Sequence, residues 1–123
     1  MKSEELLYFV ELRSFTSAWD ELGLPEEELG ALQLSIIANP KGGPVIKGTD
    51  GLRKMRYAPA SGRTGKSGAL RVCYVYFERF AIVLLVLVYP KSEQDDLPEA
   101  AKKRINQAIK RIEQYLVRIL GAR

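Results

Sequence analysis

Lysine and arginine are concentrated in the middle of a chain that contains no histidine. Residues 41–79 hold nine Lys or Arg and two acids, whereas residues 1–40 hold two Lys or Arg and eight acids. A basic segment in a chain of net charge +4 favours an anionic partner, with nucleic acid ahead of an acidic protein. The alternative is a basic surface that only keeps the fold soluble.

Three of these cations are spaced so that they can share one face of a predicted strand pair. Lys54 and Arg56 are two residues apart in the strand Leu52–Tyr57 (LRKMRY), so they lie on the same side of it. If the strand Leu70–Phe77 (LRVCYVYF) pairs with the first, Arg71 can join them. Crowded like charges are unfavourable unless an anion lies among them, and a phosphate suits such a site. The sequence therefore predicts a phosphate-binding cluster on a sheet surface.

Further cations and aromatic residues lie close to the same strands in the sequence. Lys91 follows the strand predicted over residues 80–89 and adds a cation at a strand end. Aromatic rings near such cations can stack on the bases of single-stranded RNA. The residues expected to bind RNA are Arg53, Arg63, Lys66, Tyr74 and Tyr89. For any single cation, the alternative is that it protects a sheet edge from aggregation.

The residue types that are missing exclude several classes of site. With no histidine and one cysteine, the chain lacks the common zinc site and the Ser-His-Asp and Cys-His nucleophile systems. The segment GRTGKSG at residues 62–68 has the wrong spacing for a phosphate-binding P-loop, and a strand is predicted after it instead of a helix. Cys73 is expected to be a small core residue. We therefore expect no metal and no cofactor.

Hydrophobic periodicity predicts an α+β fold. The expected elements are a strand at 4–12, helices at 15–22 and from Pro25 to Asn39, strands at 52–57, 70–77 and 80–89, and a long helix ending at Gly121. Ser14 and Asp96 are candidate caps of the first and last helices. This order predicts a small, mainly antiparallel four-stranded sheet, with two N-terminal helices and one long C-terminal helix laid on one face.

The length and the composition of the chain favour a single domain over residues 1–123. The longest apolar run, residues 81–89, is far too short for a membrane helix and suits a buried strand. The start of the chain carries acids where a signal peptide would carry a basic patch. The single cysteine favours a reducing compartment. We therefore expect a soluble, cytoplasmic protein with no membrane partner.

Three segments together resemble the RelE/HigB family of bacterial toxin–antitoxin toxins, and in particular its HigB-like branch. They are IKGTDGLRKMRY, GKSGALRVCYVYF and LVYPKSEQDDL, and the resemblance extends over roughly residues 9–112. It implies a RelE-like fold and the toxin of a type II toxin–antitoxin system, an mRNA interferase that cleaves mRNA in the ribosomal A site and inhibits translation. The implied partners are mRNA on the ribosome and a cognate antitoxin protein, in the bacterial cytoplasm.

The resemblance also implies which residues act on RNA. Lys54, Arg56 and Arg71 match the catalytic motif of the family, and Lys91 matches a further basic position. In metal-independent cleavage the 2′-hydroxyl of the RNA attacks the adjacent phosphate and gives a 2′,3′-cyclic phosphate. We expect Lys54 to be the general base, because neighbouring positive charge favours its neutral form, and Arg71 to hold the phosphorane oxygens. Lys91 or Arg56 would be the charge partner or acid.

The chain departs from the family pattern at Ala69, Pro90 and Ser92. An inactive toxin relative is therefore one alternative. A non-catalytic module that binds RNA or the ribosome with the same sheet is another. A gyrase-poisoning relative is less favoured, because that branch lacks this spread of cations on the two strands.

Overall fold

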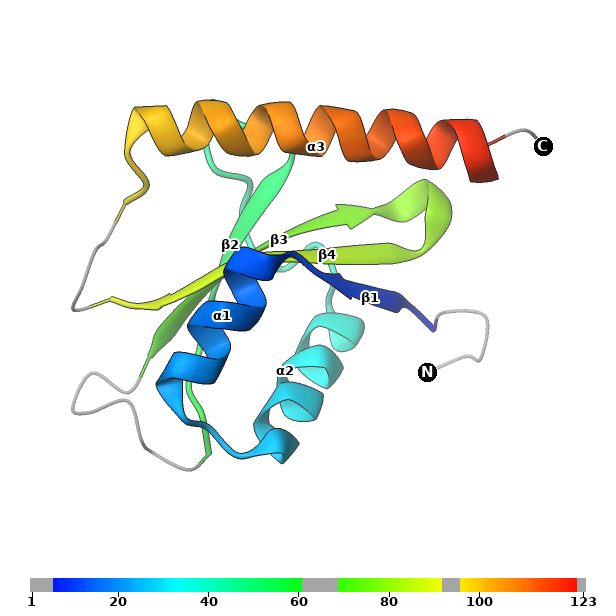
Figure 1. Cartoon of the computed structure of the whole chain (residues 1–123). Coiled ribbons are helices and arrows are strands. Elements are labelled where there is room, and N and C mark those ends of the chain that lie inside the picture. The colour runs from blue at the N-terminus through cyan, green and yellow to red at the C-terminus, as the bar shows by residue number, and fades with distance from the viewer. Residues whose placement is uncertain (1–5, 61–68, 92–95, 122–123) are drawn as a thin grey trace.

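The computed structural model describes residues 6–60, 69–91 and 96–121 of the 123-residue chain. The elements, in order, are β1 (Tyr8–Glu11), α1 (Arg13–Leu22), α2 (Glu26–Ala38), β2 (Leu52–Tyr57), β3 (Leu70–Phe77), a 3-10 turn (Glu78–Phe80), β4 (Ile82–Pro90) and α3 (Glu99–Leu120) (Figure 1). The α+β class and the predicted order of elements are confirmed.

The four strands form one sheet in the order β1-β4-β3-β2. The β2–β3 and β3–β4 pairs are antiparallel, and the β1–β4 pair at one edge is parallel. The prediction of a mainly antiparallel four-stranded sheet is therefore confirmed. The arrangement leaves β1 and β2 as the two edge strands.

The helices cover both faces of the sheet, and the expectation that all of them lie on one face is wrong. Alternate residues of β4 separate two cores: Val83 and Leu85 pack with α1 and α2, whereas Leu84 and Val86 pack with α3. Figure 1 shows α3 on one side of the sheet and α1 and α2 on the other. An apolar stripe shows that a helix buries one side, but it does not show which sheet face receives it.

A β-bulge in the β3–β4 pair fixes which β4 side chains reach α3. Cys73 pairs with Leu87 and Tyr74 with Leu85, so Val86 is an extra residue on β4. The Ser14 hydroxyl donates a hydrogen bond to the Val86 carbonyl at 2.6 Å. This bond ties α1 to the strand at the bulge, where the ladder is interrupted.

The core under α1 and α2 contains polar groups that all have partners. Phe15 and Trp19 stack with ring centroids 5.6 Å apart. The Tyr57 hydroxyl donates to the buried Glu28 carboxylate at 2.9 Å, and burial together with this bond raises the pKa of Tyr57 to about 12. The Tyr74 hydroxyl donates to the Pro40 carbonyl at 2.8 Å. These bonds stabilise the loop after α2 against the sheet.

Several predicted element ends are corrected. Leu12 precedes α1 as its N-cap, and Ser14 lies inside the helix. Pro98 is the N-cap of α3 with no side-chain cap bond, so Asp96 does not cap it. β4 begins at Ile82, after the 3-10 turn, and not at residue 80. Propensity and cap rules leave such ends uncertain by one or two residues.

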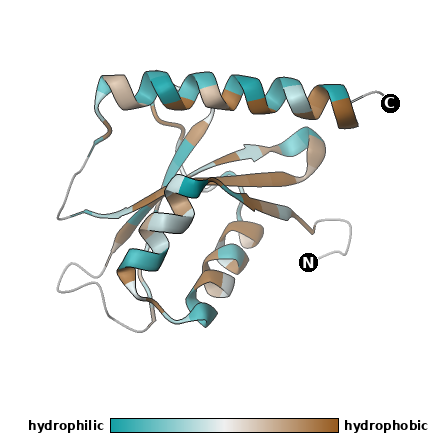
Figure 2. Cartoon of the chain, viewed as in Figure 1, coloured by the Kyte–Doolittle hydropathy of each residue, from teal (hydrophilic) through white to brown (hydrophobic). Residues whose placement is uncertain are grey.

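Hydrophobic residues follow the layers of the fold. Figure 2 shows largely hydrophobic strands, whereas α3 carries hydrophilic and hydrophobic stripes along its length. In the described ranges, no helix combines the length and the hydropathy that crossing a membrane requires.

Candidate phosphate-binding site

The β2–β3 register brings the predicted catalytic cations onto one face of the sheet. Arg56 pairs directly with Arg71, and Lys54 pairs with Cys73. Side chains of directly paired residues project to the same face, so the three cations lie on the side that α3 covers. The predicted juxtaposition is confirmed, while the chemical roles of the three residues stay predictions.

Arg71 is the most unusual member of this cation cluster, which we define as Lys54, Arg56 and Arg71. It is only 7% exposed, although the fold buries few other charged residues. Within the described residues its Nη1 atom is buried and has no hydrogen-bond partner, and no ion pair involves it. A buried charge without a partner is strongly unfavourable, so this guanidinium is suited to an anion supplied from outside.

Lys54 is held in an ion pair at the edge of the cluster. Its Nζ lies 3.5 Å from Asp96 Oδ1 in the segment that leads into α3. The Asp96 side chain is 84% exposed, so water screens this pair. Asp96 was expected to cap a helix, and no sequence pattern predicted this contact, because the two residues are 42 positions apart.

The remaining cations of the predicted site are at the surface. Arg56 is exposed, and so is Lys91, which comes one residue after the end of β4. β4 ends beside the first residue of β3, because Leu70 pairs with Pro90. Lys91 therefore follows the strand end nearest to Arg71. The cluster thus joins one buried guanidinium with cations that solvent can reach.

Arg53 and Tyr74, both expected to bind RNA, lie on the opposite face. They pair with each other across the β2–β3 ladder, next to the pair of Lys54 and Cys73. Because neighbouring residues of a strand point to opposite faces, their side chains lie on the other side of the sheet. Arg53 Nη1 donates to the carbonyls of Lys41 at 3.0 Å and Gly43 at 2.7 Å. Tyr74 is 1% exposed, and its hydroxyl also accepts a bond from the Gly43 amide. Burial gives Tyr74 a structural role in place of the expected RNA contact, whereas RNA binding by the half-buried Arg53 stays a prediction.

Tyr89 lies on the cluster face, where it pairs with Arg71. It is only 6% exposed, so its ring is not open for stacking on a base as we expected. Its hydroxyl is buried beside the Cys73 thiol, with which it interacts, and it makes no hydrogen bond of standard geometry within the described residues. Burial, followed by the thiol, raises the pKa of Tyr89 well above its ordinary value.

Cys73 is fully buried beneath the cluster, as expected of a small core residue. Burial raises the pKa of its thiol to about 11, although the nearby charge of Lys54 opposes the shift. The thiol is therefore protonated at neutral pH and is a poor nucleophile. Arg63, Lys66 and the departure at Ser92 lie outside the described residues.

The described ranges contain no group of three or more Cys, Asp or Glu side chains that could hold a metal ion. The chemistry available at the cluster is thus that of fixed positive charge, with Arg71 as an anion ligand and Lys54 as a group that can carry a proton. Both suit a phosphodiester.

Comparison with known proteins supports the fold. The structure resembles that of a double arginine-to-alanine mutant of the Escherichia coli toxin RelE in the free state, with a TM-score of 0.52 and 16% sequence identity. The match covers 87% of this chain and 98% of that chain. The RelE-like fold is therefore confirmed at low sequence identity. No model of a known protein family matches the chain.

Proposed function

We propose that the chain is the toxin of a type II toxin–antitoxin system and that it cleaves mRNA in the ribosomal A site of a bacterium. The observation that carries this proposal is the buried Arg71 guanidinium, whose Nη1 has no partner within the described residues. It lies directly opposite Arg56 and two residues from the position paired with Lys54. A scissile phosphate would supply a negatively charged partner for this guanidinium.

The cluster can perform the three tasks that RNA cleavage without a metal requires. Lys54, in its neutral form, accepts the proton of the 2′-hydroxyl, and the 2′-oxygen forms a bond to phosphorus. The bond from phosphorus to the 5′-oxygen breaks, and that oxygen takes a proton from Arg56, Lys91 or water. The products are a 2′,3′-cyclic phosphate and a 5′-hydroxyl.

Arg71 would stabilise the charge that develops on the non-bridging oxygens. Its burial keeps water away, and fixed charge acts more strongly where the dielectric constant is low. Arg71 needs no reorganisation during the reaction, because its strand pairs with β2 on one side and β4 on the other. Removing one such charged donor typically lowers a rate about 100- to 1,000-fold.

The ribosome would supply the alignment that the cluster does not provide. The cations can bind a phosphate, and the ribosome would hold the 2′-oxygen in line with the leaving group. Orientation of a substrate before reaction can contribute about 7 to 11 kcal/mol to a barrier. The basic residues would also favour ribosomal RNA in a salt-dependent manner.

Two further observations support the proposal. The fold is similar to that of a toxin, RelE, and the three quoted segments resemble the HigB-like branch of the same family. The cations that match the family motif are the ones that the sheet places together. An antitoxin protein would be the partner that silences the cluster.

The test is cleavage of mRNA in a bacterial translation extract. Wild-type protein should produce cuts within codons on ribosomes, with cyclic-phosphate ends, and Arg71→Ala should reduce cutting at least 100-fold. The matched control is Lys103→Ala, which removes an exposed cation of α3 outside the cluster and should cut like wild type. Circular dichroism and a urea titration should show that both variants are folded.

The same experiment separates the alternatives. Binding of mRNA or ribosomes without scission would select a non-catalytic module, and neither binding nor scission would select an inactive relative. If Arg71→Ala cut at the wild-type rate, the assignment of Arg71 as the charge stabiliser would be wrong.

A further inference from the structure

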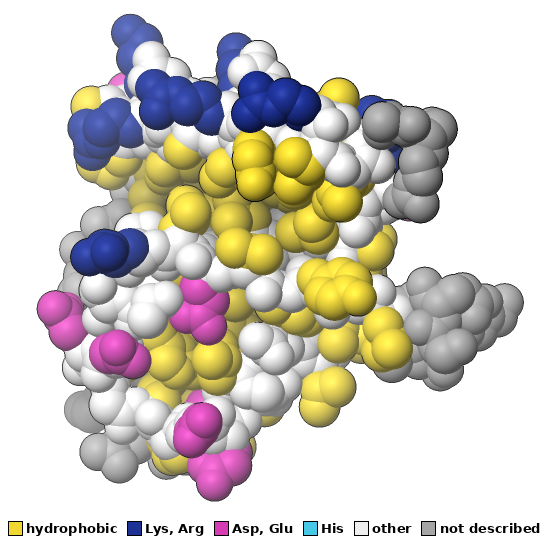
Figure 3. Space-filling view, turned by 45° about the vertical axis from the view of Figure 1, so that its right-hand side comes forward, with side chains coloured by type: hydrophobic (Ala, Val, Ile, Leu, Met, Phe, Trp, Pro, Cys, Tyr) yellow, Lys and Arg dark blue, Asp and Glu magenta, His cyan; other side chains and the backbone are white. Residues whose placement is uncertain are grey.

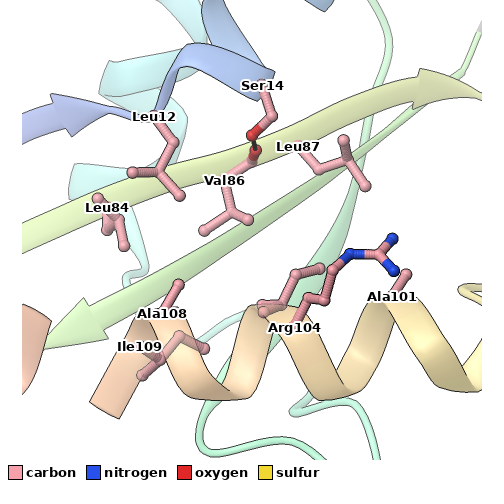
Figure 4. A pocket seen from close by; sticks show the side chains of 10 residues that line it. Leu12, Ser14, Leu84, Val86, Leu87, Ala101, Arg104, Ala108 and Ile109 are labelled. Atoms are coloured by element: carbon pink, nitrogen blue, oxygen red, sulfur yellow. Dashed lines mark hydrogen bonds between the residues drawn. The ribbon is translucent and has the colours of Figure 1, made fainter. Parts of the chain in front are cut away.

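An apolar groove lies between α3 and the sheet, on the side of the β1 edge. Its volume is about 280 Å³. Leu12, Leu84 and Val86 line it from the sheet, and Ile105 and Ala108 line it from α3. Figure 4 shows Leu12, Leu84 and Val86 on one side of a common space and Ala108 of α3 on the other. None of the residues that line the groove is acidic, and none belongs to the cation cluster.

The apolar surface continues beyond the groove along β1. Tyr8 pairs with Ile82 and Val10 with Leu84, so both project to the side that α3 covers. They are 75% and 47% exposed, which is high for large apolar residues of a strand. The β1 edge and the groove thus form one apolar surface, of the kind that marks a protein contact.

The C-terminal half of α3 extends the opposite wall. Tyr115 and Ile119 are 52% and 50% exposed. They continue the side of the helix that carries Ala108, because residues three, four and seven positions apart share a side. Figure 3 shows a band of hydrophobic side chains below the Lys and Arg residues of α3. A segment as long as α3 could therefore lie along this band.

Three arginines form a rim above the groove. Arg104, Arg111 and Arg118 are spaced seven residues apart and are exposed, so they point to one side of α3. Arg104 lines the groove, and the Arg118 guanidinium lies 5.7 Å from the centre of the Tyr115 ring. Within the described residues none of the three has an ion pair.

The other side of α3 is different. Lys102 pairs with Glu99 at 3.3 Å, and Lys110 pairs with Asp50 at 3.6 Å. The ion pairs of this helix thus lie on the side away from the groove, while the arginine rim keeps its charge available. An occupant of the groove would meet an apolar floor and a row of cations on one side.

We propose that this groove binds an amphipathic helix of a partner protein, with apolar residues toward the sheet and carboxylates seven residues apart facing Arg104, Arg111 and Arg118. A helix packed along α3 presents side chains at this same spacing, so each arginine meets one carboxylate. The seam is apolar and the flanking charges set orientation and partner choice, as in a coiled coil.

A second copy of the chain does not supply such a helix. Its α3 is basic and would face a basic rim. Its acidic helix, α2, already packs Leu32 and Ile36 into the core and buries Glu28. An RNA backbone would match the arginines, but it would leave the apolar floor uncovered. The chemistry therefore favours another protein, and its identity as the antitoxin rests on the proposed function.

The proposal is tested with a designed peptide, because its ligand is defined. The probe is a fluorescein-labelled 21-residue helix with leucine in the apolar seam and glutamate on both flanks. Fluorescence anisotropy of the full chain should show saturable binding that weakens as salt increases. The same peptide with lysine in place of glutamate should bind at least tenfold more weakly.

Two double variants of α3 provide matched controls. Arg104→Glu/Arg111→Glu should weaken binding of the glutamate peptide at least tenfold. Lys103→Glu/Lys110→Glu makes the same change in net charge on the same helix, on the side away from the groove, and should stay within threefold of wild type. Ala108→Phe should fill the groove and weaken binding without a change in charge. Circular dichroism verifies that each variant is folded.

Several outcomes would overturn the proposal. They are no binding of the glutamate peptide, equal binding by the two double variants, or sedimentation showing that a second copy covers the groove. Loss of RNA binding with unchanged peptide binding in Arg104→Glu/Arg111→Glu would assign the rim to RNA instead. Arg71→Ala should bind the peptide like wild type, so a failure of the nuclease proposal is distinguishable from a failure here.

Discussion

The two faces of the sheet bury polar side chains in opposite ways. On the α1–α2 face, the Tyr74 hydroxyl and the Arg53 guanidinium each bond to main-chain groups of the loop after α2. On the α3 face, Arg71 Nη1 and the Tyr89 hydroxyl are buried and have no partner within the described residues. A satisfied polar group stabilises a fold, whereas an unsatisfied one lowers stability unless a ligand completes it. The polar groups of the first face thus stabilise the fold, and we propose that those of the second face bind a ligand.

The largest expected effect compares two arginines of opposite faces. Arg71→Met removes a buried charge without a partner, so mRNA cleavage should fall at least 100-fold while the free energy of unfolding stays the same or rises by about 1 kcal/mol. Arg53→Met removes two hydrogen bonds to the Lys41 and Gly43 carbonyls and should lower the free energy of unfolding by about 1 to 3 kcal/mol. Urea titrations and the translation extract measure both quantities. Equal losses of stability would contradict the contrast.

The next effect is the dependence of stability on pH, which should begin at a different pH for Cys73 on one face and Tyr57 on the other. The Cys73 thiol has its pKa raised from 9.0 to about 11, so the unfolded chain loses this proton first. The contribution of this thiol to stability should therefore be constant below pH 9 and fall by about 2 to 3 kcal/mol between pH 9 and 11. Cys73→Ala should remove this decrease. The pKa of Tyr57 is raised to about 12, so its ionisation should lower stability only above pH 10. Urea titrations at each pH measure the slope, and a slope unchanged in Cys73→Ala would contradict the assignment.

A smaller effect compares two buried tyrosines. Tyr74→Phe removes the bonds to Pro40 and Gly43 and should lower the free energy of unfolding by about 1 to 2 kcal/mol. Tyr89→Phe removes a hydroxyl that has no partner within the described residues, so stability should change by less than about 0.5 kcal/mol. Thermal and urea unfolding measure both. A larger loss in Tyr89→Phe than in Tyr74→Phe would reverse the contrast between the faces.

The smallest effect concerns Asp96. Its ion pair with Lys54 is largely exposed, so Asp96→Ala should change stability by less than about 0.5 kcal/mol. Loss of a genuine helix cap would lower stability by about 1 kcal/mol. The helical signal and the urea midpoint of the variant therefore decide between the ion pair and the cap that the sequence predicted.

The parts of the fold and site that could be predicted are those that depend on short-range geometry. Side chains of a strand alternate, so the spacing of Lys54 and Arg56, and the placement of Arg71 beside them, followed from sequence once the two strands paired. The same rule places Tyr74 on the other face, and its use as an RNA contact therefore conflicted with its position in the strand.

The parts that could not be predicted depend on contacts between distant residues. The isoleucine stripe of α3 is periodic whichever sheet face receives it, so the sequence did not reveal that α3 lies opposite α1 and α2. Burial of Tyr89 depends on neighbours from β3 and α3, and alternation alone does not fix it. The Lys54–Asp96 contact joins two segments that no local pattern connects.

The extra residue at the bulge has a consequence for how the chain tolerates insertions and deletions. Deleting Val86 would make the β3–β4 ladder regular and would leave the other β4 side chains on their present faces, because Leu85 and Leu87 already pair with adjacent residues of β3. Leu85 and Val88 would still face α1 and α2, and Leu84 and Tyr89 would still face α3. A one-residue deletion at the bulge should thus preserve the division between the two faces, and its cost would be the Val86 side chain and the bond from Ser14 to the Val86 carbonyl.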